Sequence, residues 1–323
     1  MKSLISIILL SICYLSFSQN DISFSQFNVA KSLINPAAYG SEADLSFDLI
    51  YRNQWTTHKG APATFGFTGS YKITPNHSVG LNFLNDQVGI AKSNQFLVGY
   101  AYHLNFNDDQ SLSFGTNIGF ENIVNDYSSI YVIEQGDEVF AQRYSNMRMQ
   151  AGFGMFYRGP SMYLGYSLPF LFNNVNFGEQ NGIKPTLWHH YLSAGFYMNN
   201  AKKTFTFNPQ FQVKYVPNAP LQGDLILRNI INGVTSINVG YRSSNTVIGG
   251  FDFMVNNMFR FGYAFNYHIN RYAGFAATSH ELHLGFGYPY YYQKNQFQKR
   301  KYLQKGDFWK VYNKRYNKYK RRK

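Results

Sequence analysis

The feature that most constrains this chain is a recurring alternation of apolar and uncharged polar residues. In Thr204–Tyr215, aromatic and aliphatic side chains take the odd positions apart from Pro209, while Thr, Asn, Gln and Lys take the even ones. Residues 258–267 repeat the pattern, with Phe or Tyr at every odd position. A period of two predicts β-strands with one apolar and one polar face.

Such segments recur along the body of the chain, separated by turns, and predict about fourteen strands. Alternation is weakest in the two that begin near Leu221 and Val234, and Pro209 is a misfit because a mid-strand proline removes a ladder hydrogen bond. The predicted strands begin near Asp44, Ala63, His77, Gln95, Gln110, Met147, Ser161, His190, Lys203, Leu221, Val234, Thr246, Met258 and His280.

The composition of the two faces distinguishes between β-architectures. The chain has 27 Tyr and 30 Phe, yet its mean hydropathy is −0.32 and only 15% of its residues are charged. The polar face is built from Asn, Gln, Ser, Thr and Gly, whereas the outer face of a soluble two-sheet sandwich is rich in Lys and Glu. We therefore expect an all-β fold, a transmembrane antiparallel β-barrel with lipid outside and a polar lumen; the sandwich is the alternative.

The connections between segments alternate in length, as short periplasmic turns and long outer loops do in such barrels. An even number of strands then puts both termini in the periplasm. The predicted short turns are Thr74–Asn76, Arg158–Pro160, Asn199–Ala201 and Asn256–Asn257. The predicted long loops are Asn53–Pro62, Asn85–Asn94, Ile123–Asn146, Leu171–Trp188 and Asn270–Ser279.

The start of the chain is typical of an export signal. Lys2 precedes an apolar stretch from Leu4 to Phe17 that ends among small residues, which predicts a signal peptide over residues 1–18; a retained anchor is the alternative. Cys13 is the one cysteine, so the mature chain is expected to hold no disulfide and no thiol chemistry. We expect a separate segment at 19–43, a plug candidate, and the barrel at 44–292.

The net charge of +13 belongs almost entirely to the last 31 residues. Residues 293–323 contain 13 Lys and Arg against one acid, whereas residues 19–292 contain 16 basic and 16 acidic side chains. We interpret this tail as a periplasmic contact for an anionic surface or protein partner and not for nucleic acid. A solvated extension is the alternative. The candidate contact residues are Lys314, Arg315, Lys320, Arg321, Arg322 and Lys323.

No arrangement of residues predicts catalysis, a cofactor or a metal. His189 and His190 would face opposite sides of a strand, and His280 and Glu281 are expected at the rim of the last strand. Glycine–aromatic pairs such as Gly99-Tyr100 lack the further glycine and the helix of a dinucleotide site, so we interpret them as packing devices of a curved sheet. We expect a protein that is not an enzyme.

A series of short motifs runs in order along roughly residues 19–292. It begins with Phe24-Ser25-Gln26, and its first-hairpin positions are Asn35, Pro36, Tyr39, Gly40, Tyr51, Arg52, Asn53, Gln54, Trp55, Gly60, Ala61 and Pro62. It continues with Asn85-Asp86, Lys214-Tyr215, Pro220, Asp224, Tyr241-Arg242-Ser243, Gly262-Tyr263 and Ser279-His280-Glu281. This ordered series resembles the PorP/SprF family of the Bacteroidota type IX secretion system.

The resemblance implies an outer-membrane barrel that supports the export of cargo proteins, including surface adhesins used in gliding. It implies secretion components, cargo and outer-membrane lipid as partners, and brings no catalytic residue. A transport pore is the second hypothesis, and an enzyme or a purely structural surface protein the third. The basic tail departs from the family pattern, whose members end near the last aromatic strand.

Overall fold

A computed structural model describes residues 23–28, 30–56, 60–107, 109–129, 143–172, 188–202, 204–217, 219–269 and 278–290 of the 323-residue chain. The predicted signal peptide (1–18) and the basic tail (293–323), with Lys314, Arg315 and Lys320–Lys323, lie outside these residues. Among the described helices, none combines the length and the apolar character needed to cross a membrane.

Two short helices, α2 (Lys31–Ile34) and the 3-10 helix η1 (Pro36–Ala38), precede the strands, and a second 3-10 helix, η2 (Tyr127–Ser129), follows β5. The strands are β1 (Ala43–Gln54), β2 (Ala63–Thr74), β3 (His77–Val88), β4 (Ala91–Asn107), β5 (Gln110–Asp126), β6 (Arg143–Arg158), β7 (Met162–Leu168), β8 (His190–Phe196), β9 (Met198–Asn199), β10 (Phe205–Tyr215), β11 (Gln222–Ile231), β12 (Thr235–Arg242), β13 (Thr246–Val255), β14 (Phe259–His268) and β15 (Thr278–Tyr290).

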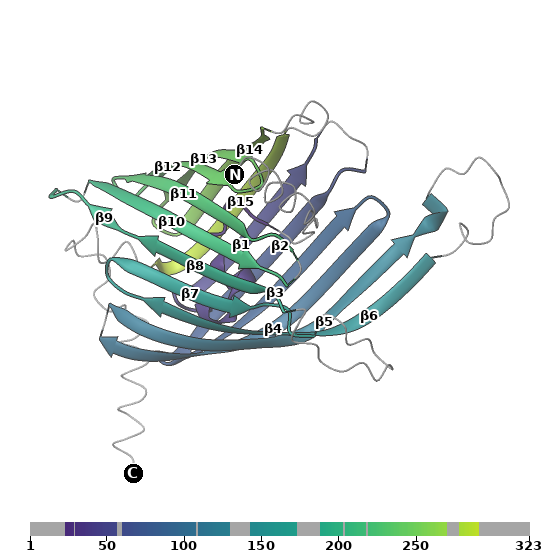
Figure 1. Ribbon diagram of the computed structural model, residues 1–323. Helices are drawn as coiled ribbons and strands as arrows, with labels where there is room; N and C mark the ends of the chain where they lie inside the picture. The colour runs from purple at the N-terminus through teal and green to yellow at the C-terminus, as the bar shows by residue number, and fades with distance from the viewer. Residues whose placement is uncertain are drawn as a thin grey trace, which may run out of the picture.

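The strands form one closed antiparallel barrel (Figure 1). Each strand pairs with its neighbours in sequence, β1 pairs with β15, and the ring continues without a break through β10 and β11. The two-residue β9 continues β8 beyond Tyr197, and both pair with β10, so the ring has fourteen staves. The predicted all-β transmembrane barrel of about fourteen strands is confirmed.

The faces of the strands are arranged as the alternation predicts. In β10, Phe205, Phe211 and Tyr215 are exposed on the outside, while Asn208 and Lys214 are buried inside. The same division in the other strands gives an apolar outer surface and a lumen lined by Ser, Thr, Asn, Gln and a few charged side chains. This is the arrangement that a bilayer requires of a barrel.

Loop lengths differ between the two rims, with one of the predicted long loops wrong. The short-turn rim carries Pro75-Asn76 and residues 256–258, whereas the long-loop rim carries residues 55–62 and 169–189.

Asn85–Asn94 was predicted as a long loop, but Gly89 and Ile90 alone join β3 to β4. The polar residues on either side continue the ladder, where Asn85 Nδ2 donates to Asn94 Oδ1 at 2.8 Å. Gly89 supplies the positive φ of +59° at this turn.

Pro209 lies within β10, and a neighbouring side chain replaces its missing hydrogen bond. The register of β10 with β8 and β9 places Pro209 opposite Phe196, whose carbonyl points toward β10. A proline has no N–H to donate there. Instead, Asn208 Nδ2 donates to the Phe196 carbonyl at 2.7 Å. The sequence misfit is thus accommodated locally.

The chain before β1 lies inside the barrel, where the purple start of the ribbon is seen in Figure 1. We call residues 23–28 and 30–42 the N-terminal segment. Phe24, Phe27, Ala37 and Tyr39 are each at most 3% exposed. Since the barrel is closed around them, these apolar side chains are shielded by lumenal side chains and not by lipid.

Candidate functional site in the barrel lumen

The N-terminal segment is held at the long-loop rim by a carboxylate. Glu281 of β15, fully buried, accepts the backbone N–H groups of Ser25 at 2.7 and 2.9 Å and of Gln26 at 3.1 Å. Arg52 of β1 donates to the Ser23 carbonyl and lies 3.5 Å from Glu281 Oε1 through its Nε. Hydrogen bonds to charged groups are stronger than neutral ones, so these contacts fix the segment firmly. We call this set the rim anchor.

Two other strands complete the rim anchor through side chains. Ser25 Oγ donates to Asn266 Oδ1 of β14 at 2.8 Å, and Gln222 Nε2 of β11 donates to Ser23 Oγ at 3.1 Å. Next to them, Arg242 and Asp224 form a buried two-point pair, with donor–acceptor distances of 2.9 and 3.0 Å. The anchor therefore joins β1, near the start of the chain, to β11, β14 and β15, near its end.

The middle of the segment crosses to the opposite wall. Asn35 Nδ2 donates to the carbonyls of Met155 in β6, at 3.0 Å, and Tyr166 in β7, at 3.3 Å. Its Oδ1 accepts the Ala37 N–H at 2.9 Å, which caps η1, where Pro36 takes the first position. Asn35 and Pro36 of the family-like motif thus shape the segment and dock it on the wall at the same time.

Tyr39 occupies a slot made by two glycines. Gly80 of β3 and Gly99 of β4 are cross-strand partners, and a Cβ on either would lie 2.2 or 2.5 Å from an atom of the Tyr39 ring. Only glycine leaves room for the ring at these positions. Burial raises the pKa of the Tyr39 hydroxyl above its ordinary value, so the phenol remains neutral. Gly99 therefore makes room for a lumenal side chain, besides any part it plays in sheet curvature.

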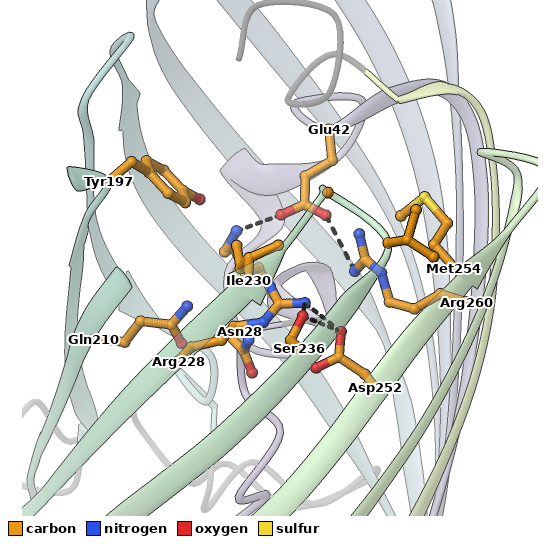
Figure 2. A pocket seen from close by; sticks show the side chains of 13 residues that line it. Asn28, Glu42, Tyr197, Gln210, Arg228, Ile230, Ser236, Asp252, Met254 and Arg260 are labelled. Atoms are coloured by element: carbon orange, nitrogen blue, oxygen red, sulfur yellow. Dashed lines mark hydrogen bonds and ion pairs between the residues drawn. The ribbon is translucent and has the colours of Figure 1, made fainter. Parts of the chain in front are cut away.

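The last part of the segment lies in a cluster of charges at the short-turn rim. Figure 2 shows Glu42 facing Arg260 of β14, beside Arg228, Ser236 and Asp252. Lys31 pairs with Glu42, and Arg228 pairs with Asp252. Burial raises the pKa of Glu42, but the positive charges of Lys31 and Arg260 lower it by more, so the net pKa is below the ordinary value. A cavity of about 50 Å³ lies among these residues.

One patch of the lumen wall is aromatic where the rest is polar. Phe156, Tyr163 and Tyr191 of β6, β7 and β8 line a small pocket together with Phe27 and Lys31 of the N-terminal segment. Lys31 Nζ also lies 4.4 Å from the centre of the Tyr163 ring, a cation–π contact. The wall thus presents a binding pocket for an aromatic side chain and for a basic side chain four residues later in the sequence.

The first-hairpin motif positions separate into two groups in the structure. The first group lies in the lumen and consists of Asn35, Pro36, Tyr39, Gly40 and Arg52; Gly40 N donates to Ser70 Oγ at 3.1 Å.

The second group belongs to the first hairpin at the long-loop rim. Trp55 N donates to the Thr278 carbonyl at 2.8 Å, and Gln54 N donates to the Pro62 carbonyl at 2.9 Å. Gly60 has a φ of +80°. The remaining positions are Tyr51, Asn53, Ala61 and Pro62.

Glu281 and His280 both lie at the long-loop rim, as expected, near the start of β15. Glu281 is nevertheless 0% exposed because Ser25 and Gln26 cover its carboxylate. His280 is half-buried, with Nδ1 2.6 Å from the Tyr263 hydroxyl. His189 and His190 do not converge: His189 packs edge-on against Phe170, whereas His190 Nδ1 lies 2.8 Å from the Tyr166 hydroxyl.

Sequence analysis missed the lumenal role of Lys31, Glu42, Arg228, Asp252 and Arg260. No local signal singles them out, because Lys31 and Glu42 precede β1, and charged residues such as Lys214, Asp224 and Arg242 occupy the same face of other strands. No three or more His, Asp or Glu side chains come together as a metal site in the described part of the chain.

The two ends of the described chain lie at opposite rims. Ser23 contacts Arg52 near the end of β1 and Gln222 at the start of β11, both at the long-loop rim. Tyr290, the last residue of β15, pairs with Ala43 at the short-turn rim. The even strand number places the start of β1 and the end of β15 at the short-turn rim. The N-terminal segment crosses the lumen before β1 begins, so Ser23 lies at the other rim. The two ends were expected on the same side of the membrane, and this holds for the start of β1 and the end of β15 but not for Ser23.

Solved structures with a similar fold are bacterial outer-membrane channels. The Pseudomonas putida toluene transporter TodX is 9% identical over 79% of this chain and 92% of its own, with a TM-score of 0.45. The CymD monoaromatic hydrocarbon channel is 11% identical over 81% and 94%, with a TM-score of 0.47. A search of curated proteins gave no match.

The model of one protein family matches most of the chain. It describes the type IX secretion system membrane protein PorP/SprF and matches residues 16–286, which include every strand up to β15 and the whole N-terminal segment. The fold agrees, since a closed antiparallel barrel with an apolar exterior is the architecture of outer-membrane proteins. This chain belongs to the PorP/SprF family of type IX secretion system membrane proteins.

Proposed function

We propose that this protein is an outer-membrane accessory component of type IX secretion that supports the export or surface attachment of cargo proteins, such as gliding adhesins. It acts by binding partners and has no catalytic role. One observation supports this above the others: the N-terminal segment occupies the lumen and is bound to the wall on all sides. A barrel filled in this way is suited to presenting surfaces, and the segment serves as its plug.

Deletion of the gene tests this proposal. We expect one or more secreted proteins to fall in abundance when the surface and medium proteomes of the deletion strain are compared with those of the parent. Restoring the gene should restore them. Unchanged abundance of every secreted protein would remove the secretion role.

The second candidate is a pore for solutes, which the polar lining of the lumen favours. Purified barrel reconstituted in a planar bilayer decides between the two. The plugged barrel is expected to give no steady ion conductance. Steady conductance, together with normal secretion in the deletion strain, would establish the pore.

For the tail, we propose a periplasmic side and an anionic partner, on the basis of its charge and of the short-turn rim where β15 ends. Secretion components, cargo and outer-membrane lipid are the proposed partners, and nucleic acid is not. Neutralising Lys314, Arg315, Lys320, Arg321, Arg322 and Lys323 to Gln should slow association with the partner, and the remaining binding should depend less on salt.

The same tail offers a control of equal charge. The control neutralises six basic residues that are closer to β15 in sequence: Lys294, Lys299, Arg300, Lys301, Lys305 and Lys310. If the position of the charge matters, this variant should lose less partner binding in the same pull-down than the first one. Equal losses from both variants would show that the charge acts without a specific contact.

A further inference from the structure

The wall of the lumen binds the N-terminal segment largely through its main chain. Glu281 accepts two successive backbone N–H groups, Arg52 donates to the Ser23 carbonyl, and Asn82 Nδ2 of β3 donates to the Ser32 carbonyl at 2.9 Å. Every polypeptide carries these backbone groups. Such contacts therefore recognise a chain in this turn and short-helix conformation with little regard to its sequence.

Side-chain recognition is added at the Tyr39 slot, at the Asn35 contacts and at the aromatic patch of Phe156, Tyr163 and Tyr191. The aromatic patch is the part that selects for a sequence pattern. It receives Phe27, which is 2% exposed, and Lys31, whose Nζ lies 4.4 Å from the Tyr163 ring. An aromatic residue four positions before a basic one is the pattern that fits this patch. The lumen thus has the two parts of a peptide-binding groove: main-chain contacts for affinity and a pocket for selectivity.

The interface between segment and wall is polar enough to exchange its occupant. Beyond the aromatic patch, the segment meets Asn, Gln, Ser, Arg and Glu side chains, and Leu33 lies beside Ile50 and Leu84 near Gly66. Buried atoms without a hydrogen-bond partner include Gln26 Oε1 and Asn28 Nδ2 in the segment, and Gln212 Oε1 in the wall. Unsatisfied buried polar atoms weaken an interface. An incoming chain that satisfied them would bind better than the resident one.

Among the described residues, the segment is covalently joined to a strand at its C-terminal end. Its last residue, Glu42, is bonded directly to β1 at the short-turn rim, whereas the rim anchor at Ser23, Ser25 and Gln26 is non-covalent and lies at the long-loop rim. Breaking the rim anchor therefore frees the segment from the long-loop side, and its covalent root keeps it with the barrel. A chain entering at the long-loop rim meets the displaceable end first.

We infer that the lumen is a polypeptide-binding site that the N-terminal segment occupies as an internal substitute ligand. Its other occupant is a segment of a partner protein that takes the same turn and short helix, with an aromatic residue four positions before Lys or Arg, and it enters from the long-loop rim and displaces residues 23–28 first. This rests on the proposed function, because the partner that it identifies is an exported protein.

Locking the segment tests the inference in cells. Ser25 Oγ and Asn266 Oδ1 are 2.8 Å apart, and Cys13 is the one native cysteine, so S25C/N266C introduces a defined pair. We expect the cross-linked barrel to hold no more cargo at the cell surface than the deletion strain does, and reductant to restore surface cargo. A short bismaleimide closes the pair where no disulfide forms.

The matched control is N85C/N94C, whose positions are direct partners in β3 and β4 with side chains 2.8 Å apart. This pair links wall to wall and should leave surface cargo at the parental level. A locked S25C/N266C barrel that holds surface cargo at the parental level overturns the inference. The proposed function fails separately, when the deletion strain itself exports and holds cargo normally.

A second readout uses purified full-length protein carrying S25C alone. Its thiol is buried between the segment and β14 and should react slowly with maleimide while the segment is docked. A synthetic peptide that copies residues 23–41 should raise the labelling rate several-fold by competition, whereas the same peptide with F27A and K31A should not. Equal rates with both peptides, or no change with either at saturating concentration, contradict a displaceable segment.

Discussion

Arg52 and Glu281 lie 3.5 Å apart on paired strands at the two ends of the barrel sequence, and the side chain of each is at most 5% exposed. Both are fully engaged with the N-terminal segment, through the Ser23 carbonyl and the Ser25 and Gln26 amides. The same two charges therefore lie at the closing seam of the barrel and at the docking point of the segment.

The first prediction concerns E281Q. The change leaves the Arg52 charge buried without its nearest counter-charge, which typically costs about 3–5 kcal/mol. We expect the N-terminal segment to become sensitive to protease in the purified barrel while the strands stay intact. D48N is the control, since Asp48 pairs with His283 on the same two strands, four residues farther from the rim. Equal protease sensitivity in both variants would mean that the anchor is not specific.

The second prediction concerns the slot for Tyr39. G80A or G99A places a Cβ inside the Tyr39 ring volume, and overpacking of this kind costs about 1–3 kcal/mol. We expect a lower midpoint of thermal unfolding, measured by the gel mobility of heated barrel. G249A is the matched control, because a Cβ on Gly249 of β13 would meet nothing within 4 Å. A drop for G249A as large as for G80A would assign the effect to strand glycines in general.

The third prediction concerns Asn208 and Pro209. N208A leaves the Phe196 carbonyl without its donor, at a cost of about 1–3 kcal/mol for a buried polar group. The P209A change supplies a backbone N–H at the position facing that carbonyl. We expect N208A to destabilise the barrel in urea unfolding and N208A/P209A to recover much of the loss. A double variant less stable than N208A would contradict this account of the strand.

The fourth prediction concerns pH. Because the pKa of Glu42 is lowered in the folded barrel, its charge contributes stability that is present in full above its ordinary pKa of 4.5. That contribution is lost as the pH falls below 4.5 through the lowered pKa. We expect the N-terminal segment to loosen over this range, measured by protease sensitivity at the short-turn rim. E42Q should be looser at neutral pH and show a weaker dependence; an unchanged pH profile would exclude Glu42 as the titrating group.

Much of the barrel follows from local pattern. The alternation around Thr206 and Phe211 determines which face each residue takes, because the side-chain period of a strand is two and an apolar face must meet lipid. The number of staves follows by counting. Strand ends were less certain, since the polar residues from Asn85 to Asn94 suit a loop and a lumen-facing ladder equally well.

The contacts of the lumenal site do not follow from local sequence pattern. Nothing local to Ser25, Glu281 or Gly80 shows that the first two meet or that Tyr39 enters a glycine slot, because these contacts join residues that are distant in sequence. The family-like motifs around Asn35 and Arg52 mark the right positions without giving their partners. The sequence by itself determined a closed two-faced sheet with a basic tail. Only the tertiary structure decided what fills the lumen, because ring closure brings β1, β11, β14 and β15 to one rim, where a buried carboxylate must find its donors.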